Sequence, residues 1–141
     1  IAGQVHDIEG ERQTPTPELL ERIHRAKTGA LLRCSVRLGA IYAGASAAEL
    51  ERLTAFGEHV GLAFQIVDDI LDVEQSSEQL GKTAGKDAAQ EKITFPALHG
   101  LEPSRAMAAA ERAAAHAALE PFGERAARLL QLADLIVDRQ S

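Results

Sequence analysis

Apolar residues recur every three or four positions over most of the chain, which is the spacing of helices that bury one face. The first such stretch follows Thr16 and Pro17, a helix cap and a favoured first helical residue. We expect this helix to run to about Gly44, a suitable terminating glycine. Its apolar positions predict a buried stripe made of Leu20, Ile23, Leu31, Cys34, Leu38 and Ile41.

The second stretch opens with Ser46 and Glu49, which have the spacing of a helix capping box. We expect this helix to reach about Gln75, and it is apolar nearly all round over residues 60–73, as in a helix buried among others. Residues 76–91 are polar and contain two glycines, so they are predicted to form a loop.

The last third of the chain is rich in alanine and predicts two more helices, at about 104–119 and 122–139, parted near Pro121. No segment alternates apolar and polar residues with the period of a strand. Aromatic residues make up only 4% and Trp is absent, whereas strands are enriched in aromatic and β-branched residues. The sequence therefore predicts an all-α fold.

Length and charge narrow the class of protein. A chain of 141 residues suffices for one domain with a core. A net charge of -6 argues against a nucleic-acid partner, which would require a basic surface. The single cysteine excludes an intrachain disulfide and fits a reducing, cytoplasmic location. No apolar run approaches the roughly 18 residues that would indicate a membrane span.

A narrow polar face interrupts the apolar surface of the second predicted helix. It consists of Gln65, Asp68, Asp69 and Asp72. Asp68 and Asp72 are one turn apart, so their side chains project the same way. A solvated helix edge is one interpretation. The apolar neighbours, and the absence of Lys and Arg over residues 53–81, favour a bound cation instead. Carboxylate ligands suit Mg²⁺ or Mn²⁺ better than Zn²⁺.

The lysines are the second clue. The chain has four, which are Lys27, Lys82, Lys86 and Lys92. Three of them lie in or just after the predicted loop, where ammonium groups near a magnesium site would suit a diphosphate ligand, although lysines also favour loops in general. Lys27 lies on the apolar stripe of the first helix. Either its stem packs while its charge reaches water, or its charge enters an anion-binding pocket.

Two other features of the sequence give little evidence of function. Gly81, Lys82 and Thr83 do not form a P-loop, because Ser76 stands where that motif needs a glycine and no strand precedes it. The histidines show no metal-binding spacing, so each is interpreted as a core or surface residue.

Residues 64–72 (FQIVDDILD) resemble the second aspartate-rich motif, FQxxDDxxD, of the trans-isoprenyl diphosphate synthases. Residues 81–87 and 92–96 resemble the GK, GxD and KxT[YF]P stretch that follows it in that family. Residues 27–28 resemble its KT pair, and residues 3–7 its GQxxD segment. These motifs occur in the family order and are most similar to the short-chain bacterial farnesyl and geranylgeranyl diphosphate synthases.

This resemblance implies an antiparallel helical bundle of the isoprenoid synthase type, a homodimer, and condensation of an allylic diphosphate with isopentenyl diphosphate. It implies metal binding by Asp68, Asp69 and Asp72, with Mg²⁺ as the expected ion and Mn²⁺ as a possible substitute. The remaining roles fall to three further sets. Lys27, Lys82 and Lys92 would bind the substrate diphosphate. Thr28 and Gln65 would stabilise the carbocation. Asp72 and Asp87 would support these groups.

One departure from the family is large. The first aspartate-rich motif, its neighbouring arginine pair and the isopentenyl diphosphate pocket have no counterpart in these residues. We therefore expect residues 1–141 to be the C-terminal part of a single prenyl-synthase domain, inactive alone. A non-catalytic subunit is the first alternative, disfavoured by the retained diphosphate ligands. A class I terpene synthase is the second, disfavoured by the GK loop and the KT pair.

Overall fold

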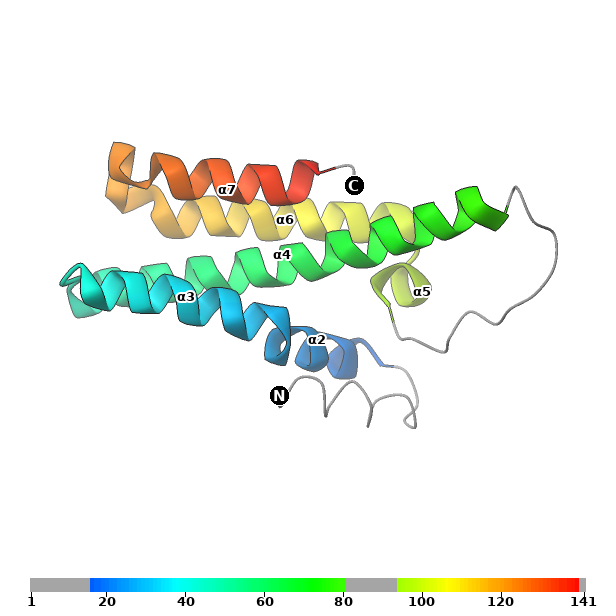
Figure 1. The fold of residues 1–141 in the computed structure, drawn as a ribbon, viewed down its shortest axis with the longest axis horizontal. Helices are drawn as coiled ribbons and strands as arrows, with labels where there is room; N and C mark the ends of the chain where they lie inside the picture. Colours follow the sequence, from blue (N-terminus) through cyan, green and yellow to red (C-terminus); the bar gives the residue numbers. More distant parts are fainter. Residues whose placement is uncertain (1–15, 81–93, 140–141) are drawn as a thin grey trace.

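The computed structural model describes residues 16–80 and 94–139, without the side chains of 76–80. These residues form helices and no strand, which confirms the all-α prediction (Figure 1). The elements are α2 (Pro17–Ala26), α3 (Thr28–Tyr42), α4 (Ala47–Leu80), α5 (Phe95–His99), α6 (Leu101–Leu119), the 3₁₀ helix η1 (Glu120–Ala126) and α7 (Ala127–Asp138).

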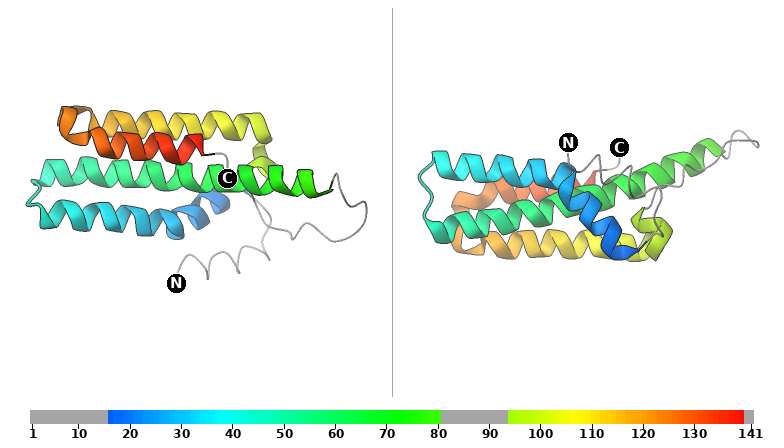
Figure 2. Two further views of the ribbon diagram at one scale, coloured as in Figure 1. Left: turned by 45° about the horizontal axis from the view of Figure 1, so that its top comes forward. Right: turned by 90° about the horizontal axis from the view of Figure 1, so that it is seen from below.

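Helix α4 is the centre of the bundle. It contacts each of the other described α-helices, with α3 along one side and α6 and α7 along the other (Figures 1 and 2). Two apolar clusters lie along its length. One gathers around Ile66 and Phe95, and the other gathers around Phe56 and Leu119. Because both clusters use α4, its apolar circumference is satisfied by neighbours on several sides.

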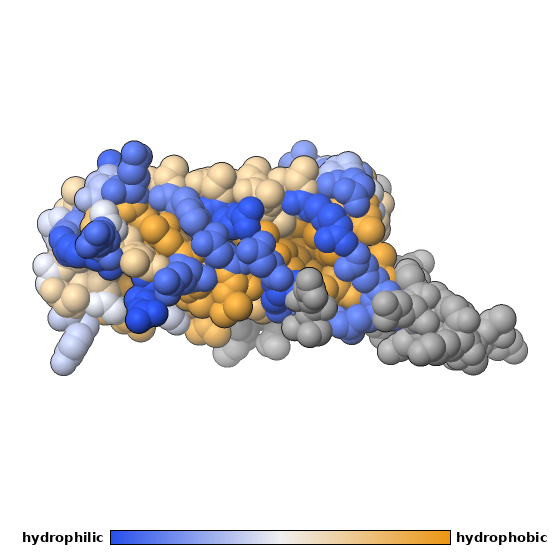
Figure 3. Space-filling view, turned by 90° about the horizontal axis from the view of Figure 1, so that it is seen from above, coloured by the Kyte–Doolittle hydropathy of each residue, from blue (hydrophilic) through white to orange (hydrophobic). Residues whose placement is uncertain are grey.

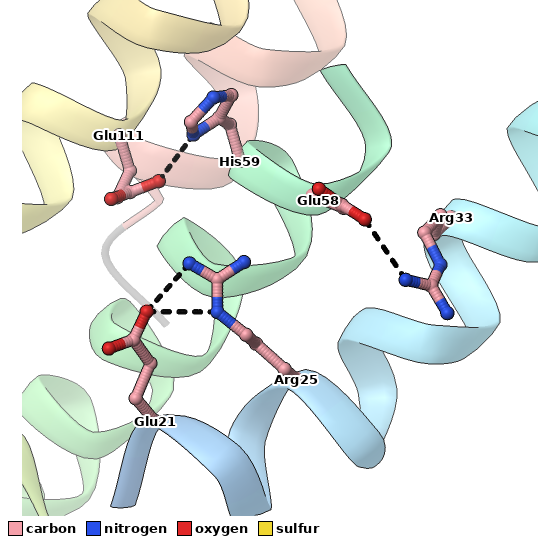
Figure 4. Close-up of polar contacts among 6 residues, drawn as sticks. All are labelled: Glu21, Arg25, Arg33, Glu58, His59 and Glu111. Atoms are coloured by element: carbon pink, nitrogen blue, oxygen red, sulfur yellow. Dashed lines mark hydrogen bonds and ion pairs between the residues drawn. The ribbon is translucent and has the colours of Figure 1, made fainter. Parts of the chain in front are cut away.

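The α3 and α4 backbones touch at glycines. A Cβ atom on Gly61 would lie 2.6 Å from the Cα of Gly29, and one on Gly57 would lie 2.9 Å from the Cα of Arg33. Such distances leave no room for a side chain, so glycine is required for this approach. The same two helices are joined at the surface by an Arg33–Glu58 ion pair of 3.0 Å (Figure 4).

The buried stripe predicted for the first helix is correct for only two of its six residues. Leu20 and Ile23 are buried, but the structure exposes Leu31, Cys34, Leu38 and Ile41, so the prediction is wrong for those four. The side of α3 that faces α4 instead carries Gly29 and Ala40, both buried, together with Leu32 and Val36. Small residues occupy this face because they allow the two helix backbones to approach closely.

The single helix predicted to reach Gly44 is in fact two. Helix α2 ends before Lys27, whose φ of -89° and ψ of -116° are not helical, and α3 begins at Thr28. The break changes the direction of the chain. Helix α2 can then pack against α4 and α5, while α3 runs alongside α4.

The start of α4 is as predicted. The backbone N–H of Ser46 donates to Glu49 Oε2 at 2.9 Å, and the N–H of Glu49 donates to Ser46 Oγ at 3.3 Å, which completes the capping box. The Ser46 hydrogen bonds lower the pKa of Glu49. Gly44 ends the preceding helix with a φ of 75°.

Other boundaries differ from prediction. Helix α4 continues beyond Gln75 to Leu80, into the segment predicted as loop, and residues 81–91 of that segment lie outside the described residues. The short helix α5 was not predicted at all. Helix α6 begins at Leu101, three residues early. The last predicted helix is divided, because Gly123 has a φ of 55° that interrupts the helix before α7.

The face over α7 mixes apolar patches with rows of polar groups (Figure 3). Leu132 and Leu135 of α7 are exposed there. A hollow of about 430 Å³ is lined by residues of α4, α6 and α7, and Arg112 in its wall pairs with Asp138 at 2.9 Å. In the described part of the chain, no helix combines the length and the apolar character needed to cross a membrane.

Candidate functional site

The three aspartates on α4 have different surroundings. The Asp69 side chain is 2% exposed, whereas that of Asp68 is 47% exposed and Asp72 also reaches solvent. Consecutive residues on a helix point about 100° apart, so Asp69 turns inward where Asp68 and Asp72 turn outward. The structure therefore brings Asp68 and Asp72 to one outer edge and places Asp69 in the interior.

Asp69 lies in a buried hydrogen-bond network with His24 of α2. The Nε2–H of His24 donates to Asp69 Oδ2 at 3.1 Å, and its Nδ1 lies 3.1 Å from Oε1 of Gln65. The histidine is 5% exposed and Gln65 is also 5% exposed. Both predicted site residues, Gln65 and Asp69, are thus held by one imidazole from the neighbouring helix.

The start of α5 completes this network. The backbone N–H of Phe95 donates to Asp69 Oδ2 at 3.1 Å, and the Phe95 ring stacks on His24 with centroids 5.4 Å apart. The preceding residue, Thr94, caps α5 by accepting from the N–H of Ala97 at 3.3 Å. A buried carboxylate needs such donors, because an unpaired buried charge is costly.

Lys27 and Thr28 lie at the break between α2 and α3. The N–H of Lys27 donates to the carbonyls of Ile23 and His24 at 3.1 and 3.3 Å, so the break is less than one turn from the histidine that contacts Asp69. Both residues are half-buried. The KT pair therefore lies about one helical turn from the residue that joins α2 to Asp69 of α4.

Asp68 has an ion-pair partner from the other end of the chain. The guanidinium of Arg139 donates to Asp68 Oδ1 at 3.1 Å and to the carbonyl of Phe64 at 3.3 Å. It also lies over the Phe64 ring, 4.3 Å from its centroid. The outer acidic edge is thus lined by one arginine even though no basic residue is near it in sequence.

The outer edge suits a magnesium ion held together with a phosphate. Mg²⁺ commonly takes one or two carboxylates, substrate phosphate oxygens and water. Asp68 and Asp72 offer two carboxylates one turn apart at an accessible edge. Among the described residues no group of three His, Cys, Asp or Glu side chains forms a closed site. This donor set therefore fits an ion whose remaining ligands come from a substrate.

Several predicted site residues cannot be placed. Lys82, Lys86, Asp87 and Lys92 lie outside the described residues, as do Gln4 and Asp7. The sequence interpretation missed two residues at the site, His24 and Arg139. His24 had a signal, since it falls one turn after buried Leu20, but that signal indicates only burial. Arg139 had none, because its contact with α4 depends on how α7 packs.

Comparison with known proteins places this geometry in a family. The sequence model described as Polyprenyl synthetase matches residues 1–132. The chain belongs to the polyprenyl synthetase family. Geranylgeranyl pyrophosphate synthase from Capsicum annuum is 50% identical over 143 residues, which cover 100% of this chain and 39% of that protein. Dimethylallyltranstransferase from Fischerella ambigua is 47% identical and is matched over 97% of this chain and 40% of its own length. The chain thus spans about two fifths of these polyprenyl synthetases.

Solved structures agree with the family fold. An FPP/GFPP synthase from Zymomonas mobilis matches 96% of this chain and 44% of its own chain, with a TM-score of 0.78 and 34% identity. A geranyltransferase from Helicobacter pylori, complexed with magnesium and isoprenyl diphosphate, matches 96% of this chain and 44% of its own, with a TM-score of 0.70 and 33% identity. These matches confirm the predicted helical bundle of the isoprenoid synthase type.

Proposed function

We propose that this chain is the C-terminal part of a prenyl diphosphate synthase that joins an allylic diphosphate to isopentenyl diphosphate. The observation that carries the proposal is the contact between His24 and Asp69, which fastens the helix before Lys27 and Thr28 to the part of α4 that bears Asp68 and Asp72. In this proposal the Lys27 ammonium and the carboxylates of Asp68 and Asp72 bind a magnesium-diphosphate from two neighbouring helices. In this proposal Lys82 and Lys92 add diphosphate contacts and Asp87 supports them.

The reaction proposed is a head-to-tail condensation. The carbon–oxygen bond of the allylic diphosphate breaks and pyrophosphate leaves with the electron pair. The allylic carbocation is then captured by the double bond of isopentenyl diphosphate, and a proton is lost. Mg²⁺, or Mn²⁺ in its place, would neutralise the leaving diphosphate when bound. Asp68 and Asp72 would hold the metal, Lys27 would clamp the phosphate oxygens, and Thr28 and Gln65 would line the cation region.

The parent chain, meaning the longer synthase of which these residues would form part, provides the test. It should convert labelled isopentenyl diphosphate and an allylic diphosphate to a longer prenyl diphosphate, with pyrophosphate released and with dependence on Mg²⁺. Residues 1–141 alone should show no turnover. A parent sequence without a first aspartate-rich motif followed by an arginine pair, or a parent that produces a cyclised hydrocarbon, would sink this proposal.

Assembly and location belong to the same proposal. We expect the parent to be a homodimer, which light scattering of the purified protein would show. We also expect it in the cytoplasm, although the pepper relative is named as chloroplastic. Imaging of the tagged parent in its own cell tests the second point, and accumulation in an organelle would contradict it.

A further inference from the structure

His24 is a buried histidine that the proposed chemistry leaves without a role. It belongs to none of the segments by which the sequence resembles its family, and its ring is 5% exposed. Both ring nitrogens of a buried histidine need a hydrogen-bond partner. This ring has a partner at each nitrogen and an aromatic ring against one face.

These contacts fix the imidazole in all three directions. Its Nε2–H donates to Asp69 at 3.1 Å, and its Nδ1 meets the side-chain amide of Gln65 at 3.1 Å. The Gln65 atom at this contact is Oε1, which accepts from an Nδ1–H, whereas an Nδ1 without hydrogen is satisfied when the amide turns so that its NH₂ donates. Stacking on Phe95 prevents the ring from tilting. The side chains of Gln65 and Asp69 are held equally firmly in return.

The elements joined by His24 are those that carry the candidate ligands. The histidine itself precedes Lys27 and Thr28 by about one helical turn. Asp69 lies between Asp68 and Asp72 on α4. Phe95, whose N–H shares the same Asp69 oxygen, begins α5 directly after the segment that contains Lys92. One buried contact therefore joins the end of α2, the aspartate-bearing part of α4 and the start of α5.

We propose that His24 is a positioning residue which, through Asp69, sets the distance between the Lys27 break and the Asp68–Asp72 edge. Asp69 then acts mainly as an internal anchor, with its Oδ2 occupied by two donors, while Asp68 and Asp72 face the metal. This inference rests on the proposed function, because it concerns the metal-diphosphate site. Residues that orient ligands in this way usually affect metal affinity about 10- to 100-fold when replaced.

The test measures binding of Mn²⁺ with inorganic pyrophosphate to the parent protein by calorimetry, alongside the melting temperature of each variant. His24→Leu removes both polar contacts and should weaken binding about 10- to 100-fold. His24→Gln places an amide N–H near the position of Nε2 and should stay within about threefold of the unsubstituted protein. His24→Asn places its amide near Nδ1 instead, loses the Asp69 contact, and should behave like His24→Leu.

His59 supplies a matched control. It also pairs with a carboxylate, Glu111, at 2.7 Å (Figure 4), and it precedes Asp68 on α4 by nine residues. His59→Leu should lower the melting temperature and leave the dissociation constant for Mn²⁺ with pyrophosphate unchanged. The comparison separates loss of stability from loss of positioning.

The outcomes are distinct. Unchanged affinity in His24→Leu together with a lower melting temperature would show that His24 is only a core residue. If His24→Gln and His24→Asn lose affinity for Mn²⁺ with pyrophosphate to the same extent, His24 does not act through Asp69. This pair of variants still tests the proposal if His24→Leu does not fold. If the unsubstituted protein binds no Mn²⁺ with pyrophosphate, the proposed function itself fails.

Discussion

Asp68 and Asp69 are neighbouring residues of the same type, but Asp68 faces solvent and Asp69 is buried. Asp69 is surrounded by donors in a dry interior, so its charge is stabilised by hydrogen bonds with fixed geometry. Asp68 meets water and one arginine, so its charge is available to a competing cation. The accessible carboxylate is therefore the better candidate for direct metal contact.

Replacing Asp68 tests that role. Asp68→Ala in the parent protein should lower the rate of prenyl transfer by about 100-fold or more, because metal contacts contribute several kcal/mol of charge stabilisation. The helix should remain folded, since the side chain is half exposed. Steady-state assay of product formation and circular dichroism provide the two measurements.

Asp138 gives the matched control for that change. It is also an exposed aspartate paired with an arginine, Arg112, at 2.9 Å. Asp138→Ala should leave the rate within about twofold, because an exposed ion pair contributes about 1 kcal/mol at most to stability. Near-normal turnover of Asp68→Ala would rule out its assignment to magnesium.

The sequence predicts which residues gather at the site better than it predicts what each one does. The spacing of Asp68 and Asp72 on one face follows from helical periodicity alone, and the structure agrees. The inward turn of Asp69 does not follow, because its immediate neighbours in sequence are as apolar as those of Asp68. Only the arrival of His24 and Phe95 from elsewhere in the chain makes a buried carboxylate tolerable at that position.

At the scale of helices, the glycine contact between α3 and α4 controls how near the KT pair comes to α4. Gly61→Ala should destabilise the protein by about 1–3 kcal/mol, because the new methyl group would overlap the Gly29 backbone. Urea denaturation followed by circular dichroism measures the change in unfolding free energy.

Gly39→Ala is the appropriate comparison for Gly61→Ala. Like Gly61 of α4, Gly39 is inside a helix, in this case α3. A Cβ added to Gly39 would meet nothing within 4 Å. This change should raise stability by up to about 1 kcal/mol, since alanine is the better helix former. Destabilisation by both changes to the same extent would mean that the close approach of α3 to α4 is not what Gly61 provides.

The capping box at the start of α4 predicts a pH dependence. Hydrogen bonds from Ser46 lower the pKa of Glu49 from its ordinary value of 4.5, so the native state favours the ionised form. The contribution to stability is therefore fully present above pH 4.5 and is lost as the pH falls through the lower native value. Glu49→Gln should reduce this part of the acid dependence.

Thermal denaturation between pH 7 and pH 3 measures the effect. The melting temperatures of Glu49→Gln and the unsubstituted protein should approach one another as the pH falls through the lowered pKa of Glu49, because the protonated carboxyl is neutral, as glutamine is. A constant difference between them across this range would contradict the assignment.

Helix starts are easier to predict than helix breaks in this chain. Ser46 and Glu49 specify a cap through their own side chains, so α4 begins where the sequence indicates. The break at Lys27 has no local cause, since no proline or positive φ is involved there. We attribute the break to two tertiary contacts on either side of it. His24 contacts Asp69, and Gly29 contacts Gly61. Contacts of this kind form only when the helices pack together, so the sequence of the segment does not predict the break.

At the scale of the whole molecule, the apolar face of α3 is unusual. Leu31, Leu38 and Ile41 are 67%, 61% and 57% exposed, and Cys34 lies among them. Their helical spacing is that of a buried stripe. We propose that the remainder of the parent synthase covers this face, since the chain corresponds to only 39% of the pepper relative.

Cys34 can report on that covering. In residues 1–141 alone its thiol should react rapidly with a maleimide, whereas in the folded parent the reaction should be at least about tenfold slower because the thiol is buried. Peptide mass spectrometry identifies modification at this position specifically. Equal labelling rates in the two proteins would contradict the proposal, and labelling in denaturant gives the fully accessible rate for comparison.

The length of α4 has a mechanical consequence. The helix is continuous over 34 residues, and Asp68 lies roughly 30 Å along its axis from the capped end, at about 1.5 Å per residue. A rod of that length amplifies angle into displacement, so a tilt of about 2° at the capped end would shift the acidic edge by about 1 Å. A misplacement of about 1 Å can slow an enzyme about 100-fold. If the proposed function holds, substitutions near Ser46 and Glu49 should therefore change the reaction rate by displacing Asp68.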